Sequence, residues 1–251
     1  MLKSFLEACY LAAQEAQEAL LALDHLTGCE PLKEGAGGDI SITYDIVSEN
    51  IFIKHLSSFG QIYSEEAGHV GQGDLLIVID PVDGSDNLKS QFPYYGASIA
   101  LQKESQNIAA FVCNFATGEC FVKAEGLPYL RKLSDVTFKE KIEINKHARV
   151  GLFEKAGLHP GAARTLMDVG LKFRAPGAVA LSLAYAHSVM YVVFLGKMRS
   201  FDIEAGLFLC EDLNIYKGEN ILVVSHNKDV FAKILTIFNL EDDSSIDKVT
   251  I

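Results

Sequence analysis

The chain has 251 residues, 49% of them hydrophobic and 22% charged, so it can bury a core as one large domain or two small ones. Its formal net charge of −11 at pH 7 argues against nucleic acid or an anionic membrane as an electrostatically attracted partner. The same charge means that an anionic substrate would need a local cation in order to approach.

The first part of the chain is predicted to be helical. Residues 1–23 carry three glutamates and apolar residues at helical spacing, which indicates a first helix and not a signal peptide. Glycine and proline then predict a loop over residues 26–38. Residues 44–60 have the apolar spacing of an amphipathic helix, which we expect to end at Gly60.

A series of short strands is predicted next. Residues 61–68 indicate a strand that runs into a turn, and the apolar residues 75–80 indicate a buried strand that ends at Asp80. Further apolar or alternating segments, separated by turn residues, predict antiparallel strands at residues 94–102, 107–116 and 119–126.

From about Glu140 the pattern changes to alternating strands and helices. We expect strands at residues 148–153, 171–175, 189–195 and 220–225, and helices at 161–170, 178–187, 202–213 and 228–240. The polar residues 241–251 are expected to form a surface segment. An antiparallel first half and an alternating second half indicate an α+β protein with two subdomains, at residues 1–139 and 140–251, that share one site.

Residues 178–195 contain no formally charged side chain over 18 positions, which is just long enough to span a bilayer. The segment is rich in alanine and leucine at first and in β-branched and aromatic residues later. We therefore prefer a helix followed by a strand to the alternative, a membrane span.

The five cysteines are widely spaced, and none forms a C-x-x-C pair. This usage fits reduced thiols better than a disulfide framework, so we expect a cytoplasmic protein. Cys113 and Cys120 could face each other across a hairpin, and two core thiols are the preferred interpretation.

Candidate chemistry is densest at residues 80–86, DPVDGSD. Asp80 and Asp83 flank a Pro-Val dipeptide, which we expect to turn the chain sharply after the apolar strand. Carboxylates this close repel one another unless water or a cation neutralises them. The Gly84-Ser85 pair that follows, at a predicted helix start, would present backbone N–H groups to a phosphate.

Other acidic residues also stand where strands end or helices begin, namely Asp45, Glu65, Glu66 and Asp202. Carboxylate oxygens suit hard cations such as Mg²⁺, and the seven histidines show no ligand spacing for zinc. The structural alternative is that these acids only cap helices or form turns. Together with the phosphate cradle they favour a metal-assisted phosphate-ester hydrolase, because bound Mg²⁺ would reverse the local field of an acidic protein.

These motifs resemble those of the inositol monophosphatase-like family of Mg²⁺-dependent, lithium-sensitive phosphatases. DPVDGS at residues 80–85 matches the family's D-P-[IVL]-D-G-[ST], and YSEEAG at residues 63–68 supplies its acidic pair. FDIEAG at residues 201–206 resembles its W-D-x-A-A-G, with phenylalanine in place of tryptophan. DISITYD at residues 39–45 keeps both aspartates of D-x-x-T-x-x-D, although Thr43 falls one position late.

The resemblance covers most of the chain between residues 39 and 225, and it implies a layered α-β-α-β-α sandwich of the sugar phosphatase type with two or three Mg²⁺ ions. The site residues that it implies are Glu65, Asp80, Val82 (through its carbonyl), Asp83 and Asp202 as metal ligands; Asp45, Glu65 and Ser85 as catalytic residues; and Gly84, Ser85 and Asp86 as substrate ligands. In this arrangement the metal would activate a water and Ser85, supported by Asp45, would orient it.

The substrate stays open among small phosphate esters. Residues 189–196, VMYVVFLG, lack the aspartate and the glutamate with which inositol-specific members contact inositol. Relatives act on inositol phosphates, 3′-phosphoadenosine 5′-phosphate or fructose 1,6-bisphosphate, and the nucleotide-acting members often have a lysine where this chain has Asp86. Relatives are commonly dimers. The alternative to an active phosphomonoester hydrolase is a family member with weak turnover that works as a regulatory or binding partner.

Overall fold

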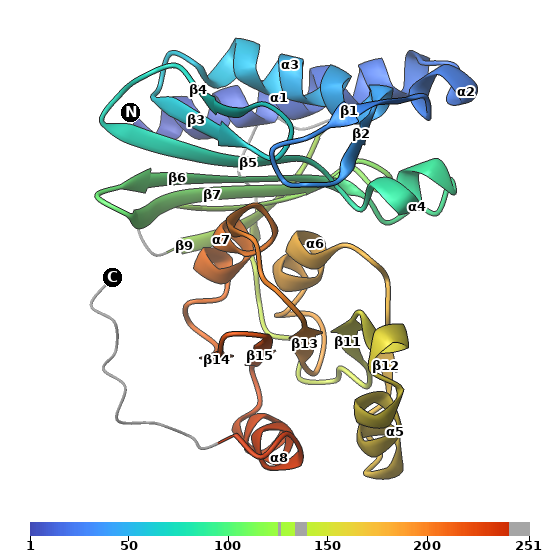
Figure 1. Ribbon diagram of the computed structural model, residues 1–251. Helices are drawn as coiled ribbons and strands as arrows, with labels where there is room; N and C mark the ends of the chain where they lie inside the picture. The colour runs from blue at the N-terminus through green and yellow to red at the C-terminus, as the bar shows by residue number, and fades with distance from the viewer. Residues whose placement is uncertain (125–126, 134–139, 241–251) are drawn as a thin grey trace.

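The computed structural model describes residues 1–124, 127–133 and 140–240, and its elements lie in layers (Figure 1). From top to bottom of Figure 1 these are helices, an eight-stranded sheet, helices, a five-stranded sheet and helices. This order confirms the predicted α+β class and the α-β-α-β-α sandwich. The predicted surface segment at 241–251 lies outside the described residues. The division at residue 139 falls beside residues that are not described and stays a prediction.

The first sheet has the strand order β10-β9-β8-β7-β6-β5-β3-β4, and its described pairings are antiparallel except for the parallel pair β3–β5. Its strands are β3 (Gln61–Ser64), β4 (Gly68–Val70), β5 (Leu75–Asp83), β6 (Gly96–Lys103), β7 (Gln106–Asn114), β8 (Glu119–Ala124), β9 (Leu127–Lys132) and β10 (Glu140–Lys141). The antiparallel series predicted for the first half is thereby confirmed.

Helices α1 (Leu2–Ala22) and α3 (Thr43–Leu56) cover the outer face of this sheet. Two core clusters on opposite faces explain why the strand β5 is continuously apolar. Ile77 and Ile79 pack with residues of α1 and α3, whereas Val78 points to the opposite face and packs with the inner helices. Alternate residues of a strand face opposite sides, so a sheet covered on both sides needs apolar residues at every position.

The inner helices α6 (Val179–Ala184) and α7 (Ser200–Leu209) lie between the two sheets. The second sheet has the order β12-β11-β13-β15-β14, and α5 (Pro160–Asp168) and α8 (Lys228–Ile237) lie beyond it. Its strands are β11 (Gly151–Glu154), β12 (Phe173–Arg174), β13 (Val192–Leu195), β14 (Asn214–Lys217) and β15 (Ile221–Ser225). The predicted alternation of strands and helices is confirmed, and β14 is an edge strand that we did not predict.

Two predictions for the first half are wrong in detail. The expected loop at residues 26–38 contains the short helix α2 (His25–Gly28) and strand β1 (Pro31–Glu34), which pairs with β2 (Ile40–Ile42). The α2 turn forms because the Asp24 carboxylate accepts a hydrogen bond from the Thr27 N–H. Helix α3 ends at Leu56 and not at Gly60. A Cβ at residue 60 would lie 2.4 Å from the Leu75 carbonyl oxygen, so glycine is needed there for close backbone contact.

The prediction of a sharp turn at Pro81-Val82 is also wrong. Strand β5 continues to Asp83, which still pairs with Gly96 of β6, and the register shifts between Asp80 and Asp83. Pro81 and Val82 stand opposite the single residue Ala97, and this one extra residue is an irregularity of the kind that re-aims side chains at sheet edges and sites.

Residues 178–195 form α6 and β13, so the predicted helix followed by a strand is confirmed. Among the described residues, every helix is too short or too polar to cross a membrane.

Candidate active site

A cavity of about 690 Å³ opens where the ends of β3 and β5 meet the first turns of α3, α4 (Ser85–Lys89) and α7. Acidic and basic side chains both line it. They are Asp39, Asp45, Glu65, Glu66, Asp80, Asp83, Asp86 and Asp202, with Lys89, Lys155, Lys197 and Arg199. Every residue predicted for the site lines this cavity, although the chain separates the first from the last by more than half its length.

Glu65 and Asp80 come together because β3 and β5 are parallel neighbours. Ser64 pairs with Ile79 in register, so the residues that follow them, Glu65 and Asp80, lie side by side. The Glu65 N–H donates to the Ile79 carbonyl, at 3.1 Å, and fixes that register. Asp80 is almost completely buried, and its Oδ1 accepts a hydrogen bond from the Val82 N–H at 3.0 Å.

Asp83 connects this edge to the inner helical layer. Its Oδ2 accepts a hydrogen bond from the Leu181 N–H, at 2.8 Å, in the first turn of α6. The first N–H groups of a helix have no partner within it, so this carboxylate satisfies one of them from another segment. Asp202 stands in the first turn of α7 and reaches the same cavity from the other side.

Asp45 and Ser85 form a hydrogen-bonded pair across the cavity wall. The Ser85 hydroxyl lies 2.9 Å from Asp45 Oδ1 and 3.0 Å from the Val82 carbonyl oxygen. The second oxygen of Asp45 accepts from the Ile42 N–H at 2.9 Å, so the carboxylate caps α3 and holds Ser85 at once. Asp45 therefore caps the helix, as the structural alternative expected, and it contacts Ser85 as well.

The turn before α4 requires glycine. Gly84 has φ +88°, and a Cβ there would lie 3.0 Å from both the Ala178 Cβ and the Tyr94 carbonyl oxygen. The Asp86 side chain is 92% exposed, and its Oδ1 lies 2.5 Å from Lys89 Nζ. The charge of the Asp86 carboxylate is thus paired at the surface. The group of Asp86 that is suited to hold an anion is its backbone N–H.

Burial dominates the electrostatics of the acidic cluster. It raises the pKa of the Asp80 and Asp83 carboxyls well above the usual range, and neighbouring carboxylates raise both further. Burial also raises the pKa of Glu65 to about 7, although Arg199 opposes that shift. Burial likewise raises the pKa of the Asp45 carboxyl.

Arg199 is the cation that balances these carboxylates in the structure. Its guanidinium contacts Glu65 at 2.6 Å, Asp202 at 2.9 Å and Asp39 at 2.8 Å. We did not predict this role. The spacing of Arg199 and Asp202, one helical turn apart, could have indicated their pairing, whereas the contact with Glu65 depends on the tertiary structure.

The donor set fits a hard divalent cation. It consists of carboxylate and carbonyl oxygens, which Mg²⁺ prefers, and the guanidinium shows where a positive charge is stabilised. Within the described residues, no three His, Cys, Asp or Glu side chains converge closely enough to hold a metal ion as they stand. A metal would therefore need the side chains around Arg199 to rearrange.

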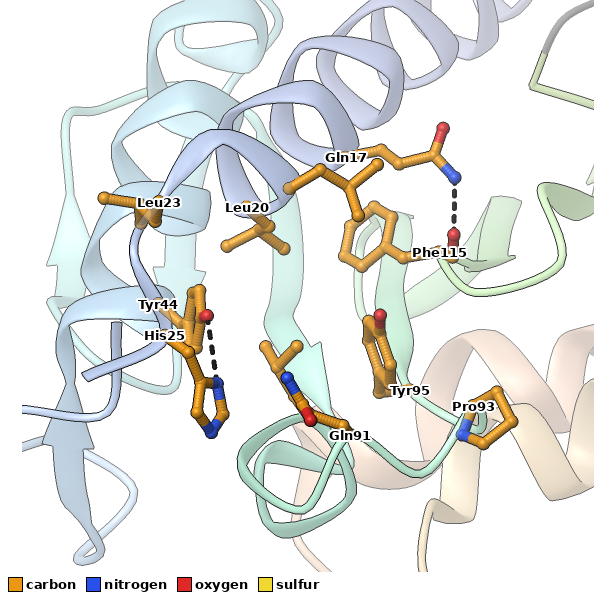
Figure 2. Close-up of a pocket in the computed structure, with 11 residues that line it drawn as sticks. Gln17, Leu20, Leu23, His25, Tyr44, Gln91, Pro93, Tyr95 and Phe115 are labelled. Carbon is orange, nitrogen blue, oxygen red and sulfur yellow. Dashed lines mark hydrogen bonds between the residues drawn. The ribbon is translucent and has the colours of Figure 1, made fainter. Parts of the chain in front are cut away.

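A second cavity, of about 260 Å³, lies behind the start of α3 and is shown in Figure 2. Tyr44 and Leu88 line it, whereas their near neighbours Asp45 and Ser85 face the acidic cavity. The Tyr44 hydroxyl lies 3.4 Å from His25 Nδ1, as the dashed line in Figure 2 marks. The two elements that carry the Asp45–Ser85 pair thus separate the two cavities.

The chain is similar to known proteins in both sequence and structure. A model of the inositol monophosphatase family matches residues 2–214. A Methanothermobacter thermautotrophicus protein described as fructose-1,6-bisphosphatase/inositol-1-monophosphatase is 29% identical, over 90% of this chain and 94% of that protein. Nus factor SuhB of Xylella fastidiosa is 26% identical, over 82% of this chain and 78% of that protein. The Thermotoga maritima IMPase has a TM-score of 0.77 at 20% identity and covers 93% of this chain and 96% of that one.

Proposed function

The chain belongs to the inositol monophosphatase family and is a phosphatase, and from this we propose that it is a Mg²⁺-dependent hydrolase of a small phosphorylated metabolite. Members of this family are generally metal-dependent. The observation that carries the proposal is the convergence of Glu65, Asp80, Asp83 and Asp202 on one cavity beside the Asp45–Ser85 pair.

The proposed metal ligands divide into two sets that share Asp80. Glu65, Asp80 and the Val82 carbonyl would hold one Mg²⁺, and Asp80, Asp83 and Asp202 would hold a second. We propose two or three ions in all. Bound Mg²⁺ would lower the pKa of a water and stabilise the charge that develops on the attacking and leaving oxygens. Asp83 is already fixed by the Leu181 N–H, so the α6 N-terminus orients one ligand in advance.

The other residues would position the substrate and the attacking water. The Ser85 hydroxyl donates its hydrogen bond to Asp45, which leaves the lone pairs of the Ser85 oxygen free to accept a hydrogen bond from that water and so to orient it. The N–H groups of Gly84, Ser85 and Asp86 begin α4 and would donate hydrogen bonds to the phosphate oxygens. No covalent bond between Ser85 and phosphate is proposed.

Two lysines at the cavity favour a substrate with a second anionic group. Lys155 and Lys197 line the cavity, and within the described residues neither has a carboxylate within ion-pair distance. The Lys155 ammonium lies 4.8 Å from the centre of the Phe194 ring, which holds it at the cavity wall. We therefore place fructose 1,6-bisphosphate and 3′-phosphoadenosine 5′-phosphate ahead of inositol 1-phosphate.

The test is phosphate release from these three compounds, with Mg²⁺ and with EDTA, by wild type and Asp80→Asn. We expect Mg²⁺-dependent release that falls by at least about a hundredfold in Asp80→Asn. Asp168→Asn, an exposed aspartate paired with Arg164, is the control and should keep wild-type activity. No release from any of the three, with metal still bound, would favour the regulatory or binding role. Absence of metal binding would contradict the proposed site.

Three further features belong to the proposal. Li⁺ should inhibit the active enzyme, and a failure to do so would count against the metal assignment. We propose a cytoplasmic location on the basis of the cysteine usage, which fractionation of the native cells would check. We also propose a homodimer, which the mass measured by light scattering would distinguish from a monomer.

A further inference from the structure

Arg199 lies among the carboxylates that the proposed metal site requires. Its Nη1 is 2.6 Å from Glu65 Oε1 and 2.8 Å from Asp39 Oδ2. Its Nε and Nη2 lie 3.1 and 2.9 Å from the two carboxylate oxygens of Asp202. The guanidinium fork therefore engages both oxygens of Asp202 and one oxygen of Glu65, which is the bidentate geometry in which arginine binds carboxylates well.

These contacts conflict with metal binding at the same oxygens. A divalent ion held by Glu65, or one held by Asp202, would lie within a few Å of the guanidinium, and two cations at that separation repel each other strongly where water is largely excluded. The Glu65 and Asp202 side chains are 12% and 9% exposed, so solvent screens the repulsion only in part. The metal and the guanidinium cannot both keep these contacts.

We propose that Arg199 is a tethered cation, which occupies the acidic cavity of the metal-free protein and leaves Glu65 and Asp202 when a divalent ion binds. This inference rests on the metal site of the proposed function. It makes Arg199 a positioning residue with two effects. It holds the carboxylates together in the absence of metal, and it lowers the apparent metal affinity because the ion must first displace it.

Asp39 provides a position for the displaced guanidinium. Its side chain is 80% exposed, and it lies in the turn between β1 and β2, at the edge of the cavity. Arg199 can therefore keep an ion pair at this edge while it releases the two more deeply buried carboxylates. Metal binding would then also affect the turn at residues 35–39, because Arg199 ties that turn to the start of α7.

The direct test is the affinity for Mg²⁺ and Mn²⁺, measured by isothermal titration calorimetry on wild type, Arg199→Gln and Lys197→Gln. We expect Arg199→Gln to bind metal at least about tenfold more tightly, because no cation has to be displaced. Lys197→Gln removes one positive charge from the same cavity without a contact to these carboxylates, so its affinity should change by less than about threefold.

The outcomes separate this inference from the proposed function. Unchanged or weaker metal binding by folded Arg199→Gln, while wild type binds metal, would overturn the role of Arg199 and leave the proposed function standing. No metal binding by wild type would overturn both. Arg199→Lys keeps a charge that cannot form the bidentate contact, so its metal affinity should lie between those of wild type and Arg199→Gln.

A second measurement needs no substitution. Phenylglyoxal labels accessible arginine side chains, and peptide mass spectrometry would report the rate at Arg199 and, as a reference, at the exposed Arg164. Mg²⁺ should increase the labelling of Arg199 severalfold and leave that of Arg164 unchanged, since the metal frees the guanidinium from two buried partners. Labelling of Arg199 that Mg²⁺ slows or leaves unchanged would contradict the inference.

Discussion

The Ser85 hydroxyl is fixed by two oxygen atoms, Asp45 Oδ1 and the Val82 carbonyl. A hydroxyl has one proton and two lone pairs, so donation to Asp45 leaves its lone pairs available to a water in the cavity. Asp45 in turn is held by the Ile42 N–H at the start of α3. The orientation of one hydroxyl therefore depends on a helix start, a strand end and the turn into α4.

Removing that hydroxyl should abolish most of the activity and little of the fold. We expect Ser85→Ala to lower kcat by about a hundredfold or more, since a group that positions or transfers a proton contributes on that scale. Ser85→Thr keeps the hydroxyl and should keep most of the activity. Steady-state kinetics with the preferred substrate and metal titration by calorimetry check this. Equal kcat values for Ser85→Ala and wild type would contradict the role of Ser85.

At the scale of elements, three chain segments, β3, β5 and α7, bring four carboxylates to one cavity for different reasons. The parallel pairing of β3 with β5 places Glu65 beside Asp80. The irregular end of β5 places Asp83 at the N-terminus of α6, and the first turn of α7 supplies Asp202. The site thus depends on how closely α6 and α7 pack between the two sheets.

Helices α6 and α7 are in close contact at Gly206, where an added Cβ would lie 2.5 Å from Leu183 Cβ. We expect Gly206→Ala to push the helices apart, to lower the free energy of unfolding by about 1–3 kcal/mol and to lower kcat/KM by displacing Asp202. Gly161→Ala in α5, where a Cβ meets no atom within 4 Å, is the matched control and should not destabilise the protein. Urea unfolding and kinetics would measure both. A Gly206→Ala variant as stable as wild type would contradict this prediction, because it would show that the two helices can separate without a loss of stability.

At the scale of the whole molecule, the protein buries several acids although its net charge is already −11. A carboxyl whose pKa is higher in the folded than in the unfolded chain binds more protons when folded. Its contribution to stability is therefore present below the unfolded pKa and is lost as the pH rises through the folded pKa. Glu65, with a pKa of about 7, and Asp80 and Asp83, with pKa values raised well above the usual range, all act in this direction.

We therefore expect the metal-free protein to become more stable as the pH falls from about 8 to about 6. In EDTA, the Tm should rise by at least about 2 °C over that interval. Mg²⁺ should raise the Tm more at the higher pH, because a metal binds the deprotonated carboxylates. Glu65→Gln should show a smaller pH effect than wild type. A Tm in EDTA that is constant or falls as the pH is lowered would contradict the raised pKa values of the buried carboxyls. Differential scanning calorimetry would provide these values.

Local signals in the sequence were sufficient for the main helices and strands and for the identity of the acidic cluster, but they missed the short elements α2, β1 and β14. Apolar runs and alternation predicted β5 to β8, and the changed pattern after residue 140 predicted the alternating second half, because burial on one or both faces leaves a short-range periodicity. The residues 80–85 and the acids at strand and helix ends predicted one shared cavity. Of residues 80–85, all but Pro81 line it, as do Asp45, Glu65, Glu66 and Asp202, and the catalytic roles stay predictions.

Only the tertiary structure decided how the charges of that cavity are arranged. Asp86 points to solvent and pairs with Lys89, and the path of β5 through Pro81 depends on its pairing with β6. The contact of Arg199 with Glu65 joins residues that lie more than a hundred positions apart. Local sequence patterns report which residues are polar or buried, whereas the partner of a charge is set by the packing of separate layers, which no short-range periodicity records.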